Sequence, residues 1–113
     1  MSMKLFNNFI NSINGLKIAF NEHSFVSEII LGLFIVPYVI IVELNLLFKL
    51  IIILTYFLLL AFEIFNTSIE KLSDKITKKY DNDLKEIKDL ASASVFLILI
   101  ILVIEIFFSF LIK

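Results

Sequence analysis

Three long apolar runs along the chain predict helices that cross a membrane. No residue from Ile29 to Val42 is charged, but these positions cover only about 21 Å of a hydrocarbon core roughly 30 Å thick. We therefore expect the first spanning helix over 24–45. The second run predicts a helix over 47–76, whose later part extends beyond the membrane into the cytoplasm. The third predicted span covers 90–112.

The segment over 3–21 predicts a helix of another kind. Apolar residues recur at i, i+3, i+4 and i+7 from Phe6 to Phe20, and asparagines stand between them. This period indicates an amphipathic helix that lies on the membrane surface, although an ordinary packing helix would show the same spacing. The pattern as a whole predicts an all-α membrane protein, with one surface helix and three transmembrane helices in a single domain over 1–113.

Composition supports the membrane assignment and excludes several kinds of site. Apolar residues make up 60% of the 113 residues, against about 45–50% in soluble domains. A net charge of −1 argues against nucleic acid as a partner. The chain has no Cys and one His, His23, so thiol catalysis and His-rich metal sites are excluded. The N-terminus shows no cleavable signal pattern, so we expect the helices themselves to direct insertion.

The lysines predict which side of the membrane each connection occupies. Six of the ten Lys lie in 71–88, whereas the short connection over 43–49 has one. By the positive-inside rule the longer connection is cytoplasmic, and with three spans the N-terminal helix is cytoplasmic too.

An acidic stripe begins where the second apolar run ends. Glu63, Asn66, Glu70 and Asp74 fall at about 0°, 300°, 340° and 20° around a helix. A carboxylate facing lipid is costly, so Glu63 should face protein or water, where it could accept a proton. Glu70 and Asp74, with Glu22, could bind Mg²⁺ on phosphates. Alternatively, Glu63 ends the span at the lipid headgroups and the other charges are simply solvated.

Further polar positions lie along the third predicted span. Lys88 and Asp89 precede the small residues of 91–94; Lys88 could contact a polyphosphate, and the small residues would allow close helix packing. Alternatively, Lys88 only anchors the helix at the membrane surface, and the small residues only form a packing seam. Glu105 should face a helix interface or the far aqueous side. No G-x-x-x-x-G-K-[ST] run occurs, so any ATP would be bound by carboxylates, Mg²⁺ and Lys on helices.

Three blocks of sequence together resemble the bacterial diacylglycerol kinase family of small integral-membrane lipid kinases. They are "GLKIAFNEHSFVSE", "FEIFNTSIEKLSDKI" and "YDNDLKEIKDLASASV", and the resemblance covers nearly the whole chain. It implies ATP-dependent phosphorylation of diacylglycerol to phosphatidic acid, with Mg²⁺ as cofactor, in the bacterial inner membrane. It also implies a homotrimer whose active sites lie between subunits at the cytoplasmic surface.

The resemblance implies a role for each matching residue. Glu63 matches the catalytic base, and Glu22 and Glu70 match the metal ligands. The implied nucleotide contacts are Lys4, Glu22, Glu70, Lys79, Tyr80, Asp81, Lys88 and Asp89. The implied lipid contacts are Lys4, Glu63, Asn66 and Ser92. The chain departs from the family pattern at Val26, Asp81 and Ala91, where Arg, His and Gly are common.

The sequence is also compatible with two other functions. An undecaprenol kinase of the same family would share these motifs, and a small non-enzymatic membrane subunit would share the apolar spans.

Three spans of one chain should be too few to surround Glu63, Asn66, Ser92 and Glu105 with protein. We therefore expect a closed homo-oligomer, a trimer by resemblance.

Overall fold

The apolar runs form three long helices, and the asparagine-rich segment forms a fourth. The computed structural model describes residues 2–112. Its elements are α1 (Ser2–Ala19), α2 (His23–Ile41), α3 (Leu46–Ile76) and α4 (Asn82–Ile112). No strand occurs among these residues, and α2, α3 and α4 are each long and apolar enough to cross a membrane. The expected all-α architecture with three candidate spans is therefore confirmed.

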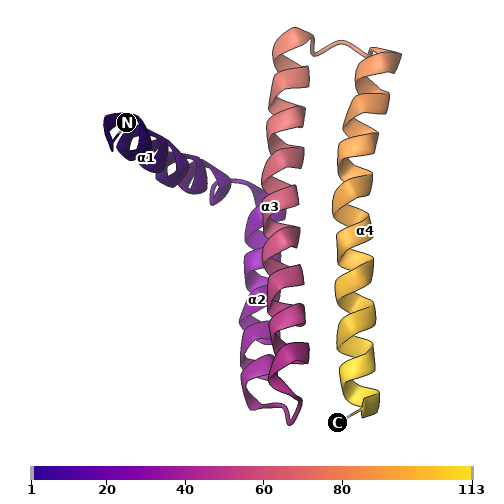
Figure 1. The fold of residues 1–113 in the computed structure, drawn as a ribbon. Helices are drawn as coiled ribbons and strands as arrows, with labels where there is room; N and C mark the ends of the chain where they lie inside the picture. The colour runs from indigo at the N-terminus through magenta and orange to yellow at the C-terminus, as the bar shows by residue number, and fades with distance from the viewer. Residues whose placement is uncertain (1, 113) are drawn as a thin grey trace.

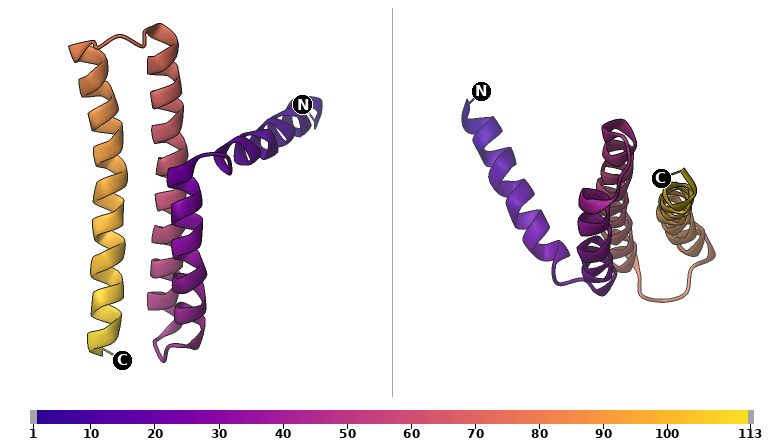
Figure 2. Two further views of the ribbon diagram at one scale, coloured as in Figure 1. Left: turned by 180° about the vertical axis from the view of Figure 1, so that it is seen from behind. Right: turned by 90° about the horizontal axis from the view of Figure 1, so that it is seen from below.

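The three long helices lie side by side, while α1 points away from them (Figure 1). Figure 2 shows the same arrangement from behind and from below, with α1 on the far side of α2 and α3 from α4. α3 packs against both α2 and α4 and is thus the central helix. Nearly all side chains of α1 from Met3 onward are exposed within the single chain.

The first long helix ends earlier than the sequence predicted, and Asn45 instead caps the start of the next helix. α2 ends at Ile41, and its 19 residues rise about 28 Å, close to the thickness of the hydrocarbon core. Asn45 Oδ1 accepts a hydrogen bond from the backbone N–H of Phe48 at 2.8 Å, which caps the start of α3. α3 then continues without interruption through the acidic stripe to Ile76, as expected.

The last helix begins eight residues before the predicted span, at Asn82. Asp81 Oδ1 accepts a hydrogen bond from the backbone N–H of Leu84 at 3.0 Å, so Asp81 caps the helix. The connection between α3 and α4 shortens to 77–81 as a result. Lys88 and Asp89 therefore lie on a helix that is already formed, beside the C-terminal end of α3.

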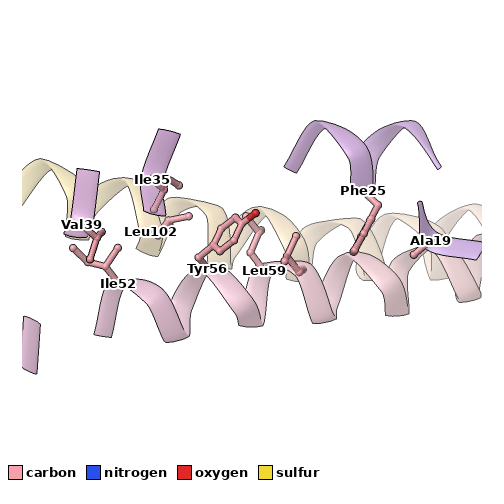
Figure 3. Packing of buried hydrophobic residues seen from close by; sticks show 9 residues of the cluster. Ala19, Phe25, Ile35, Val39, Ile52, Tyr56, Leu59 and Leu102 are labelled. Atoms are coloured by element: carbon pink, nitrogen blue, oxygen red, sulfur yellow. The ribbon is translucent and has the colours of Figure 1, made fainter. Parts of the chain in front are cut away.

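The apolar core lies along α3, between α2 and α4 (Figure 3). Its best-buried side chains come from all three long helices: Phe25, Ile35 and Val39 of α2, Ile52, Tyr56 and Leu59 of α3, and Leu102 of α4. Most of the other apolar side chains of α4 are exposed, as expected for a helix that faces lipid or another subunit.

Two polar contacts cross this core near the end of the bundle far from the acidic stripe. Thr55 Oγ1 donates to Glu105 Oε2 at 3.0 Å, and the hydroxyls of Tyr38 and Ser109 lie 2.6 Å apart. Glu105 therefore faces the interface between α3 and α4, which was one of the two expectations for it.

We predict that Gly32→Ala destabilises the bundle. A Cβ at Gly32 would overlap the phenol of Tyr56, whose hydroxyl donates to the backbone oxygen of Glu28 at 2.8 Å. Displacing the ring should cost about 1–3 kcal/mol of unfolding free energy, as overpacking usually does. Unfolding in mixed detergent micelles, followed by circular dichroism, measures this cost. Gly15→Ala is the matched control, since nothing lies within 4 Å of its added Cβ, and equal stability of the two variants would contradict the prediction.

Candidate active site

The acidic stripe is organised by the amide of Asn66. Its Nδ2 donates to Glu63 Oε2 at 3.3 Å and to Glu70 Oε1 at 3.2 Å. The three residues are three and four positions apart on α3, so they share one face of the helix. Glu63 is only 5% exposed and Asn66 9%, whereas Glu70 is open to solvent. The stripe thus leads from a buried carboxyl group to an accessible one.

The burial of Glu63 and Asn66 corrects one sequence-based expectation. Three helices of one chain were expected to be too few to surround these groups, yet the single chain buries both. The physical reason is that α2 packs against α3, with Phe25 buried in the core between the helices (Figure 3) and Glu28 close to Glu63. The expectation holds better for Ser92, which is exposed on α4.

A second carboxyl group, that of Glu28 on α2, faces Glu63. The two carboxyl groups are close enough to interact electrostatically. Glu28 Oε2 is buried and has no hydrogen-bond partner among the residues that the structure describes. The acidic stripe on α3 therefore has a further carboxyl group beside it, which α2 contributes.

The oxygen donors near Glu70 fit a hard divalent cation. Glu22 lies in the turn after α1, and its Oε1 is 3.0 Å from the ammonium of Lys71, the residue after Glu70. Asn66 Oδ1, in the same stripe, is buried and accepts no hydrogen bond from the described part of the chain. Within 2–112 no three His, Cys, Asp or Glu side chains gather into a complete metal site. This sparse oxygen set suits Mg²⁺, which usually takes one or two carboxylates together with phosphates and waters.

A basic pocket of about 210 Å³ lies where α3 ends and α4 begins. Its lining includes four of the expected nucleotide contacts, Lys79, Tyr80, Asp81 and Lys88. Lys78 and Lys85 line it as well, although the sequence analysis gave them no role. Lysines gathered around a pocket provide point charges suited to a polyphosphate.

Two ion pairs neutralise part of this pocket, and one of them connects its two helices. Lys88 Nζ lies 2.7 Å from Asp74 Oδ1, and Lys85 Nζ lies 2.7 Å from Asp89 Oδ2. The hydrogen bond from Lys88 holds the pKa of Asp74 below its usual value, and the hydrogen bond to Asp89 raises the pKa of Lys85. Asp74 therefore turns from the stripe toward α4, where it stays ionised as a partner of Lys88.

Comparison with known proteins identifies the class of this membrane protein. The model of the prokaryotic diacylglycerol kinase family matches residues 10–110, which include the acidic stripe, Glu22, Glu28 and the basic pocket. The chain belongs to this family. No curated protein matches it. The resemblance drawn from the three sequence blocks is thereby confirmed, and the family makes the protein a lipid kinase.

The single chain of this lipid kinase does not bring all the expected site residues together. Lys4 lies in the first turn of α1, whose N-terminal end points away from the long helices (Figure 1). Ser92 is exposed on α4. Glu63, Asn66 and Glu70 share the stripe, while the nucleotide candidates gather at the pocket near the end of α3.

Glu28 of the kinase has no predicted function, since in the sequence it is only the charged residue before the uncharged run 29–42. The signal that could have found it was the F-x-x-E spacing in "FVSE", which sets Glu28 one helical turn after the buried Phe25. Its proximity to Glu63 depends on how α2 crosses α3, which the sequence does not reveal.

Proposed function

We propose that this lipid kinase transfers the γ-phosphoryl group of ATP to the hydroxyl of diacylglycerol, forming phosphatidic acid at the cytoplasmic surface of the bacterial inner membrane. The observation that carries the proposal is the continuity of α3. One helix bears the buried Glu63, the exposed Glu70 and, at its end, the basic pocket. A lipid hydroxyl at membrane level and a nucleotide outside the membrane would therefore meet along this helix.

In the proposed reaction Glu63 acts as the general base. Its carboxylate accepts the proton of the lipid hydroxyl while the lipid oxygen bonds to the γ-phosphorus and the bond to the β–γ bridging oxygen breaks. Asn66 keeps Glu63 oriented through its hydrogen bond. Contacts from Ser92 and Lys4 would position the lipid, and ADP leaves as the second product.

Charged groups between Glu63 and the end of α3 would bind the nucleotide, together with Lys4. Glu22 and Glu70 would hold Mg²⁺, which when bound neutralises charge on the phosphates. Lys88 and Lys4 would add positive charge beside the phosphates, with Asp89 orienting the nucleotide nearby. Tyr80 is exposed at the pocket, where its ring could stack on the adenine, flanked by Lys79 and Asp81.

Transfer of labelled phosphate to two lipids tests this function. Purified protein in mixed micelles is given labelled MgATP with diacylglycerol or with undecaprenol, and the lipid products are separated. We expect faster labelling of diacylglycerol. Preference for undecaprenol would favour the related polyprenol kinase, and labelling of neither lipid would favour a non-enzymatic membrane subunit. Protein carrying Glu63→Gln measures the background.

We further propose that the active kinase is a homotrimer in which α1 lies on the membrane surface. Two features support this assembly. Lys4 is on a helix that points away from its own stripe, and Ser92 lies exposed in the small-residue segment of α4, which permits close helix packing. In a trimer, Lys4 and Ser92 of one subunit could reach the acidic stripe of a neighbouring subunit.

We predict that a mixture of two inactive variants regains activity only when the two altered residues come from different chains at one active site. Mixing Glu63→Gln subunits with Lys4→Glu subunits should recover part of the activity lost by each. The control is Glu63→Gln mixed with Glu70→Gln. Both residues lie on the same α3, so every α3 in this mixture carries one substitution and no site is intact. Equal recovery in the two mixtures, or an active preparation of monomers by native mass spectrometry, would refute the shared-site trimer.

A further inference from the structure

Lys71 makes a contact that neither the sequence blocks nor the family match explains. It follows Glu70 on α3, and its ammonium lies 3.0 Å from Oε1 of Glu22, the proposed metal ligand in the turn after α1. The two side chains are 58% and 34% exposed, so the ion pair lies partly in solvent. Such pairs contribute little to stability and exchange readily.

The contact matters because both proposed metal ligands already have a partner within the chain. Glu70 accepts from the neutral amide of Asn66, which can remain in place when a metal binds. Glu22 instead faces a full positive charge. A divalent ion at Glu22 would repel an ammonium held at the same carboxylate, so the two cations compete for it.

We propose that Lys71 is the resting counter-ion of Glu22 and that Mg²⁺ displaces it when the metal binds. This inference rests on the proposed assignment of Glu22 as a metal ligand. Lys71 then lowers the affinity for the metal in the absence of nucleotide. Once released, its ammonium stays beside Glu70 on the rigid α3, where the negative phosphates of a bound nucleotide can attract it.

Mn²⁺ binding measured by electron paramagnetic resonance tests the competition without any catalytic turnover. The full chain in detergent is titrated with Mn²⁺, alone and with a non-hydrolysable ATP analogue. Lys71→Met should tighten Mn²⁺ binding by up to about fivefold without nucleotide, the range expected from an exposed ion pair. Lys75→Met is the matched control: it removes the same charge from the next turn, and Lys75 has no ion pair among the described residues.

Zero-length cross-linking tests the displacement itself. A carbodiimide should join Lys71 to Glu22 in metal-free protein, and mass spectrometry of the peptides identifies the bond. Saturating Mg²⁺ should suppress this product. The Lys85–Asp89 pair, at 2.7 Å on α4, is the internal control, and its cross-link should persist when Mg²⁺ is added without nucleotide.

Different outcomes separate this inference from the proposed function. If Lys71→Met and Lys75→Met change Mn²⁺ affinity equally, if Lys71→Met weakens binding, or if the cross-link survives saturating Mg²⁺, the role of Lys71 is refuted. If Glu22→Gln weakens Mn²⁺ binding while Lys71→Met has no effect, only the Lys71 inference fails. If Glu22→Gln leaves Mn²⁺ binding unchanged, the metal assignment of Glu22 fails, and the inference fails with it.

Discussion

Replacing Glu63 by Gln should lower kcat by about 10²-fold or more while nucleotide binding is retained, because the amide cannot take the proton of the lipid hydroxyl. The amide is nearly isosteric with the carboxylate, and its oxygen can still accept from Asn66 Nδ2. The bundle should therefore fold normally. Initial rates of labelled phosphate transfer at saturating MgATP and lipid measure the effect.

The matched control for this variant is Glu86→Gln, which removes a carboxylate exposed on α4. It should leave kcat within a factor of about two, since solvated surface charges contribute little. Circular dichroism and binding of a fluorescent ATP analogue establish that Glu63→Gln is folded and binds nucleotide. Near-normal turnover of the Glu63→Gln protein would remove this residue from the proposed mechanism.

The second large effect is expected at the proposed metal ligands. Glu70→Gln and Glu22→Gln should each raise the Mg²⁺ concentration needed for half-maximal activity by about tenfold or more. Losing an outer partner of a metal site typically costs 10–100-fold in affinity, and losing a ligand should cost at least as much. Activity measured over a series of free Mg²⁺ concentrations, at constant ATP, gives the shift for each variant.

The Mg²⁺ dependence of the two variants also separates metal binding from general electrostatics. Glu86→Gln, which removes the same charge from α4, should leave the half-maximal Mg²⁺ concentration unchanged. Excess Mg²⁺ should restore part of the activity of Glu70→Gln and Glu22→Gln but none of that lost in Glu63→Gln. Identical Mg²⁺ curves for all variants and the parent protein would rule out Glu70 and Glu22 as ligands.

The helical spans and the acidic stripe could be predicted because both depend on local spacing. Apolar runs fix the spans, and the three- and four-residue steps from Glu63 to Glu70 place these groups on one helix face whatever surrounds them. Helix ends were harder to predict, since a single capping side chain decides them. Asp81 accepts a backbone hydrogen bond that starts α4 eight residues before the predicted span, and Asn45, expected at the end of the first span, instead caps the start of α3.

The parts of the site that depend on packing could not be predicted from spacing. Glu28 lies near Glu63 only because α2 packs against α3 at that level, and the same packing helps to bury Glu63 within one chain. The pair between Lys71 and Glu22 likewise depends on how the turn after α1 lies on α3. No repeat in the sequence relates these residues, so their proximity appears only in three dimensions.

The uninterrupted run of α3 from Glu63 to Ile76 restricts where the chain can change length during evolution. One residue inserted between Asn66 and Glu70 would rotate every later group by about 100° and raise it by about 1.5 Å. Glu70 would then leave the face that Asn66 holds, and the basic pocket would turn away from the stripe. Insertions and deletions among homologous chains should therefore be absent from this helical segment and should collect instead in the connection over 77–81.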